Sequence, residues 1–160
     1  MGWYHVYHSG KGMILGESRD IKFVPEVFCD YYSKKTGKEC SFLQALRLIN
    51  EDYPKWYVDE TSSDKRFLVC ANELCSLVLH EIFEERYGYP QNSFFSISDY
   101  DFTVMLFCNA KWPPEKYNKA LAELTEAKLK KQLQEFLSEV TGNEKFKTKE
   151  LEFCEEYIKE

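Results

Sequence analysis

The sequence lacks the segments that would place the chain in or across a membrane. No apolar run approaches the roughly 18 residues that a transmembrane helix needs. The first eight residues, Met1 to His8, have neither the basic start nor the apolar stretch of a secretory signal peptide. We therefore expect a cytoplasmic protein that makes no membrane contact.

The chain also lacks an excess of basic residues. It has 21 Lys and Arg against 27 Asp and Glu, which gives a formal net charge of −6 and a pI near 5.2. Direct binding to a nucleic-acid backbone needs a surplus of Lys and Arg, so we do not expect it. An acidic surface instead favours a protein partner with a basic surface.

Histidine is scarce and the cysteines are not arranged as metal or redox motifs. The six cysteines include no C-x-x-C pair, and several lie in apolar runs, as in Leu68–Ala71. We expect them to be free, buried thiols in a reducing compartment. Only His80 and Glu84 have a spacing that could present two metal ligands on one helix face, and the H-E-x-x-H motif is absent. The sequence predicts no metal site and no cofactor.

Glycine-rich phosphate-binding motifs are absent too. The segment Ser9-Gly10-Lys11-Gly12 lacks the spacing of a P-loop and of G-x-G-x-x-G. We interpret it as a hairpin turn between short strands at residues 3–8 and 13–15. An alternative is a small-ligand site that includes His8, Lys11 and Arg19, in which aromatic rings stack a nucleotide base while Lys11 or Arg19 holds its phosphate.

What the sequence has in abundance is aromatic and apolar residues. Aromatic residues make up 16% of the chain and hydrophobic residues 44%, enough for a substantial core in 160 residues. Helices are predicted after Pro25, up to Gly37, and after a capping box at Ser41 and Gln44. A wide apolar arc over residues 66–87 predicts a central, buried helix, although residues 67–71 alone also fit a strand.

Further along the chain, residues 94–97 and 102–108 have the composition of paired strands. A long helix is predicted from Trp112 to Val140, and a last amphipathic helix from Phe146 to Ile158. The order of these elements predicts an α+β fold with a small, mainly antiparallel sheet packed against four or five helices. We expect a single compact domain over residues 1–160.

Two segments combine large aromatic residues with carboxylates outside the predicted core. Tyrosine and tryptophan dominate interface hot spots, and adjacent acids would attract a basic partner. The predicted partner-binding residues are Tyr53, Trp56, Tyr57, Asp59, Glu60, Asp99, Tyr100 and Asp101.

These observations favour a small binding or inhibitory protein that occludes a protein partner, as a toxin-immunity protein or a phage-encoded inhibitor of host defence does. Two alternatives stay open. One is the nucleotide-binding or nucleotide-sequestering protein described above. The other is a small enzyme centred on His8, or on His80 with Glu84, although the sequence shows no complete catalytic set and we assign no catalytic residue.

Overall fold

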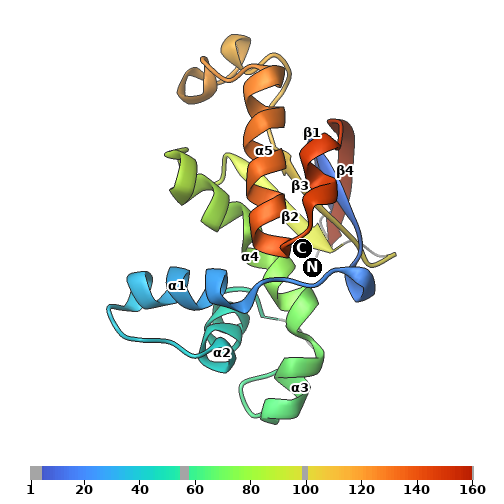
Figure 1. Cartoon of the computed structure of the whole chain (residues 1–160). Helices are drawn as coiled ribbons and strands as arrows, with labels where there is room; N and C mark the ends of the chain where they lie inside the picture. Colours follow the sequence, from blue (N-terminus) through green and yellow to red (C-terminus); the bar gives the residue numbers. More distant parts are fainter. Residues whose placement is uncertain (1–4, 55–57, 99–100, 160) are drawn as a thin grey trace.

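The computed structural model of the chain describes residues 5–54, 58–98 and 101–159 (Figure 1). These residues form an antiparallel sheet with the strand order β2-β3-β1-β4, together with five α-helices and four short 3-10 helices. The strands are β1 (His5–Glu17), β2 (Phe94–Ser98), β3 (Thr103–Cys108) and β4 (Glu152–Lys159). The α-helices are α1 (Pro25–Thr36), α2 (Phe42–Asp52), α3 (Asp64–Val69), α4 (Ala71–Tyr87) and α5 (Glu126–Thr141). The predicted α+β class, with a small antiparallel sheet and four or five helices, is confirmed.

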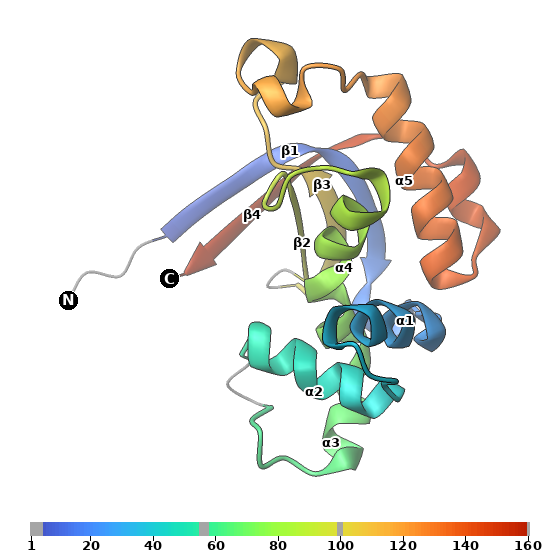
Figure 2. The same cartoon turned by 90° about the vertical axis from the view of Figure 1, so that its left-hand side faces the viewer.

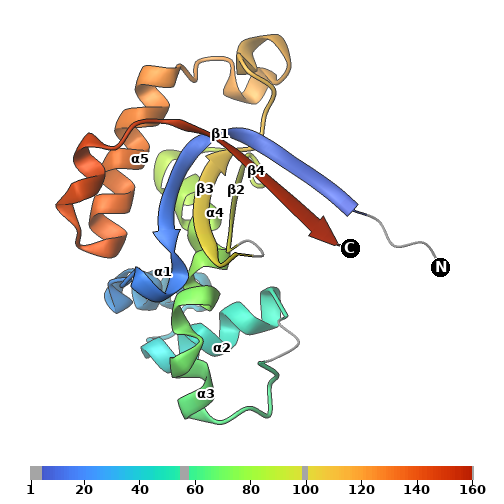
Figure 3. The ribbon, with the colours of Figure 1, turned by 90° about the vertical axis from the view of Figure 1, so that its right-hand side faces the viewer.

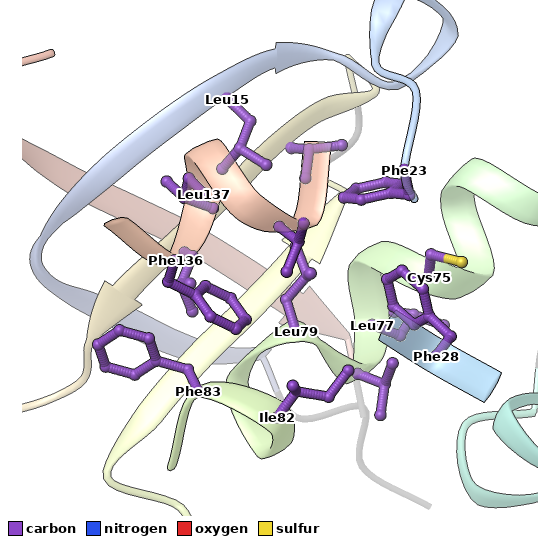
Figure 4. Packing of buried hydrophobic residues seen from close by; sticks show 14 of the residues in the cluster. Leu15, Phe23, Phe28, Cys75, Leu77, Leu79, Ile82, Phe83, Phe136 and Leu137 are labelled. Atoms are coloured by element: carbon purple, nitrogen blue, oxygen red, sulfur yellow. The ribbon is translucent and has the colours of Figure 1, made fainter. Parts of the chain in front are cut away.

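The helices form two groups around the sheet. Helices α4 and α5 cover one face, while α1, α2 and α3 lie together beyond one end of the sheet (Figures 1 and 2). Between sheet and helices lies the main core, in which Leu15 faces Leu137 while Phe83 and Phe136 meet edge to face at 5.3 Å (Figure 4). In the described part of the chain, none of the helices has the length and apolar character that crossing a lipid bilayer requires.

Helices α1 and α2 follow their sequence signals. Ser41 and Gln44 form the predicted reciprocal capping box of α2, and Gly37 ends α1 in the left-handed conformation. The buried helix predicted over residues 66–87 is two helices, because the chain turns at Cys70 between α3 and α4. Residues 67–69 therefore belong to a helix and not to a strand.

The predicted hairpin at Gly10 and Gly12 is wrong, because β1 runs without a turn through both glycines. Gly10 and Gly12 both lie against the backbone of β3, which is too close to leave room for a side chain at either position. A Cβ on Gly10 would lie 1.7 Å from the Cys108 carbonyl oxygen, and one on Gly12 would lie 2.2 Å from that of Leu106. The glycines are there because β3 crosses closely at this point, which is the other common role of glycine within a strand.

Beyond this crossing, the first half of β1 pairs only with β4, and the two strands form a ribbon that extends from the sheet (Figures 2 and 3). The ribbon curls over the sheet face that no helix covers. His8 of β1 thereby stacks on Phe95 of β2, with ring centroids 4.1 Å apart. This curl buries a second, smaller apolar cluster made of Met105, Phe107 and Cys154.

Two predictions for the C-terminal part are wrong. The long helix begins at Glu126, and residues 112–125 form turns and 3-10 helices instead. The predicted last helix over residues 146–158 is a 3-10 helix followed by strand β4. Along β4, Cys154 and Glu156 are buried while Phe153 and Glu155 are exposed, so the pattern has the two-residue period of a strand.

Candidate functional site

A groove between α1 and α4 gathers carboxylates and tyrosine rings at the surface. One hollow of about 400 Å³ lies between α1, α4 and the loop after α4. A second hollow of about 380 Å³ adjoins it and shares Tyr31, Lys34 and Glu85. We call this pair of hollows the α1–α4 groove; its charged residues are Asp30, Glu81, Glu84, Glu85 and Glu139 against Lys34, Lys35 and Arg86.

The charges along the groove are only partly paired. Lys35 Nζ lies 3.5 Å from carboxylate oxygens of both Glu81 and Asp52, and Arg86 bonds Glu139 at 2.5 Å. Across the described residues, no Lys or Arg lies within ion-pair distance of Asp30 or Glu85. Five carboxylates face three cations in the groove, so its potential is negative.

Lys35 shows that this environment accommodates a cation. Its ammonium group lies 5.6 Å from the ring centre of Tyr31 and 5.5 Å from that of Tyr32, within the range of cation–π attraction. Together with Glu81 and Asp52, these rings surround the ammonium with aromatic faces and carboxylates. The groove therefore already holds one cation of the chain itself between carboxylates and aromatic rings.

A chain of hydrogen bonds, buried at Ser96 and His80 and half-buried at Tyr53 and Glu81, supports the inner wall of the groove. Tyr53 of the loop after α2 donates its hydroxyl hydrogen to Glu81, so it can only accept from His80 Nε2, which lies 3.2 Å away. His80 Nδ1 is then the acceptor for the Ser96 hydroxyl at 2.9 Å, a shorter contact than the one from Ser96 to the Leu77 carbonyl at 3.4 Å. The chain Ser96–His80–Tyr53–Glu81 joins β2, α4 and the end of α2.

The pKa shifts agree with a neutral imidazole in this chain. Burial lowers the pKa of His80, and the neighbouring Glu81 offsets part of that effect. Burial also raises the pKa of Tyr53, as does its hydrogen bond to Glu81. Both groups are therefore held uncharged at neutral pH, while the Glu81 carboxylate at the groove receives the hydrogen bond.

Glu84, predicted as a partner of His80, faces different groups. Its carboxylate accepts hydrogen bonds from the backbone N–H groups of Phe94 at 2.9 Å and Asn92 at 3.3 Å, so it anchors the start of β2. Burial raises the pKa of Glu84, and these backbone bonds oppose the rise. Among the described residues, no three His, Cys, Asp or Glu side chains come together as a metal-ligand group.

The predicted partner-binding residues lie in several places. Tyr53 is half-buried and reaches the groove through Glu81. Asp59 is exposed and closes its own turn, because its carboxylate accepts from the N–H of Thr61 at 2.8 Å and from the Thr61 hydroxyl at 2.6 Å. These bonds lower the pKa of Asp59. Glu60 is exposed beside this turn.

The remaining predicted partner-binding residues belong to the segments around Trp56 and Tyr100. Asp101 is exposed in the turn between β2 and β3. Trp56, Tyr57, Asp99 and Tyr100 lie outside the described residues.

The residues of the alternative ligand site do not come together. His8 faces the curled side of the ribbon, where its Nδ1 lies 3.1 Å from the amide nitrogen of Asn109. Lys11 faces the opposite side and lies 3.8 Å from Glu126. Arg19 is in the 3-10 turn that follows β1 and pairs with Glu17 at 2.7 Å.

Sequence reasoning missed the groove because its residues come from separate helices. The local signal was the presence of Glu81, Glu84 and Glu85 within one and a half helical turns, although only Glu85 is fully exposed in the structure and Glu84 is buried. Tyr31 and Asp30 are on the matching side of α1, but nothing local in the sequence shows that α1 packs against α4.

No protein-family model, no curated protein and no solved structure matches this chain. The assignment of a function therefore depends on the geometry alone.

Proposed function

We propose that this protein binds and occludes a protein partner, and that a basic side chain of the partner enters the α1–α4 groove. The observation that carries the proposal is the excess of carboxylates in the α1–α4 groove, whose walls include Tyr31 and Tyr89, and in which neither Asp30 nor Glu85 forms an ion pair with a Lys or Arg in the described part of the chain. Rows of acids beside tyrosine rings attract Lys and Arg and hold them by ion pairs and cation–π contacts.

The groove is already shaped before a partner arrives. Glu81 is held by the hydroxyls of Tyr31 and Tyr53 and by Lys35, so its carboxylate needs little further ordering. A preorganised acceptor loses less conformational entropy on binding, which improves affinity for the same contacts.

The proposal also includes the two aromatic–acid segments predicted from the sequence as part of the partner-binding surface. Tyr53 connects the groove to the chain that leads through Trp56 and Tyr57 to Asp59 and Glu60. The second segment is that of Tyr100 and Asp101. A partner covering the groove and these segments would be occluded over an area larger than one pocket, as a toxin-immunity protein or a phage-encoded inhibitor of host defence requires.

The test compares charge reversals inside and outside the groove. Affinity-tagged protein is incubated with extract of its source cells, and captured proteins are identified for the wild type and for Asp30→Lys, Glu85→Lys and Glu123→Lys. All three sites are exposed, so the variants should fold, which circular dichroism verifies. We expect one partner with a basic surface, whose capture falls at least about tenfold with the two groove variants and is unchanged with Glu123→Lys.

The aromatic segments are tested in the same assay with Trp56→Ala and Tyr100→Ala, for which we expect weaker capture. The proposal is wrong if no partner is captured specifically, or if the Asp30, Glu85 and Glu123 variants all retain it to the same extent.

A further inference from the structure

A pocket on the β1–β4 ribbon brings aromatic rings and lysines together on the side facing α5. It has a volume of about 280 Å³ and lies between the ribbon and residues 109–112, which follow β3. It shares no residue with the α1–α4 groove. We call it the ribbon pocket. The side chains in its lining that could contact a ligand are those of Tyr7, Lys11, Lys111, Trp112 and Phe153.

The aromatic side of the ribbon pocket is set by the pairing of the strands. Lys11 pairs directly with Phe153, and Tyr7 points to the same side as Lys11 because residues four apart on a strand share a face. Tyr7 is 48% exposed and Phe153 is 60% exposed, which is unusual for large rings at the wall of a hollow. Trp112 completes this aromatic wall from the segment after β3.

The basic side of the pocket is made by two lysines from different segments. Lys11 comes from β1 and Lys111 from the loop after β3. The acids nearby are Glu126, which lies 3.8 Å from Lys11, and Glu155, which pairs with Ser9 across the ribbon. An anionic group is therefore best placed at the Lys11 and Lys111 end, where it would compete with Glu126 for Lys11.

We propose that the ribbon pocket binds a nucleoside phosphate, with the base against Tyr7, Trp112 and Phe153 and the phosphate between Lys11 and Lys111. Every nucleobase has a flat face that stacks on aromatic rings, and ammonium groups bind phosphate strongly. The pocket is slightly smaller than the usual range for drug-sized ligands, so it suits one base with its phosphate at the rim. This site stands independently of the partner-binding groove.

The direct test is isothermal titration of the full chain with ADP, GDP, CDP and UDP, and with adenosine and inorganic phosphate as the two separate halves of the ligand. We expect at least one nucleoside diphosphate to bind about tenfold or more tightly than either adenosine or phosphate, because only the whole ligand reaches both sides of the pocket.

Variants then assign the binding to the pocket. Lys11→Met and Phe153→Ala should each weaken nucleotide binding about tenfold, and both are partly or largely exposed positions whose replacement leaves the core intact. Glu126→Gln should strengthen binding by about twofold or more, since it releases Lys11. Lys38→Met, at an exposed lysine outside the pocket, is the matched control and should leave binding unchanged.

Any of four results would overturn the proposal. The first is no binding of any nucleotide at about 1 mM. The second is equal affinity for inorganic phosphate and the diphosphates, which would leave no role for the aromatic wall. The third is binding of single-stranded oligonucleotides without binding of mononucleotides. The fourth is a loss of nucleotide binding with Lys38→Met as large as that with Lys11→Met.

Discussion

Gly12→Ala should be among the most damaging single methyl additions in this chain. The new Cβ would lie 2.2 Å from the Leu106 carbonyl oxygen and 2.4 Å from Phe107 Cα. Both atoms belong to the backbone of β3, so the clash can be relieved only by moving two paired strands apart. Overpacking typically costs about 1–3 kcal/mol, and a clash with backbone at this distance belongs at the upper end, near 3 kcal/mol.

The change is measured by urea unfolding followed by circular dichroism. We expect a lower midpoint with an unchanged m-value, and a Tm lower by roughly 6–12 °C, from roughly 2–4 °C per kcal/mol for a chain of this size. The matched control is Gly37→Ala. Gly37 has a φ of +72° and nothing within 4 Å of an added Cβ, so only conformational strain of about 1 kcal/mol is expected there.

A Gly12→Ala variant no less stable than Gly37→Ala would refute the account of β1 as one strand closely crossed by β3. It would instead favour the hairpin turn that the sequence alone predicted, in which an added methyl at residue 12 has room.

The other predictions concern the hydrogen-bond chain Ser96–His80–Tyr53–Glu81. Ser96→Ala should lower the free energy of unfolding by about 1–3 kcal/mol, because it leaves His80 Nδ1 buried without a donor; equal stability of the two proteins would contradict the proton placement. The pKa of His80 is lowered in the folded protein, so below pH 6.5, the approximate pKa of histidine in the unfolded chain, the unfolded state binds a proton that the folded state does not. The contribution of His80 to the free energy of unfolding is therefore complete above about pH 6.5. It is lost below that pH by at most about 1.4 kcal/mol per pH unit. The difference in the free energy of unfolding between wild type and His80→Gln should therefore shrink from pH 7 to pH 5.5. Titration of Glu84 affects both proteins equally and cancels in this difference. A constant difference would show that the pKa of His80 is not lowered.

The parts of the fold that sequence reasoning predicted correctly are those with local causes. The capping box at Ser41 and Gln44 and the glycine after α1 are determined by the chain's own backbone, and both lie where expected. The strands β2 and β3 were likewise marked by short apolar runs on either side of a turn.

The errors arose where a distant segment determines the local structure. Gly10 and Gly12 have the composition of a turn, and only the position of β3 makes them part of a strand. The spacing of Phe146 and Phe153 fits a helix as well as a strand. Residue 153 lies in a strand because it pairs with β1. Short segments of this kind are ambiguous from periodicity alone.

The candidate site was predictable only in its chemistry. The combination of tyrosines with carboxylates and the preference for a basic partner came from composition, whereas the meeting of Tyr31, Tyr53 and Glu81 depends on how α1, α2 and α4 pack. His80 and Glu84 were expected to act together, but each side chain bonds a different residue of β2. His80 bonds the hydroxyl of Ser96, and Glu84 accepts a hydrogen bond from the backbone N–H of Phe94.

The most direct measurement of the central claim is site-specific photo-crosslinking in the source cells. A photoreactive phenylalanine derivative replaces Glu85 in the α1–α4 groove in one protein and Glu123, outside it, in another; both positions are exposed. The account predicts one discrete crosslinked protein from position 85, joined through a segment rich in Lys or Arg, and none from position 123. No adduct from position 85, or the same adduct from both positions, would contradict it.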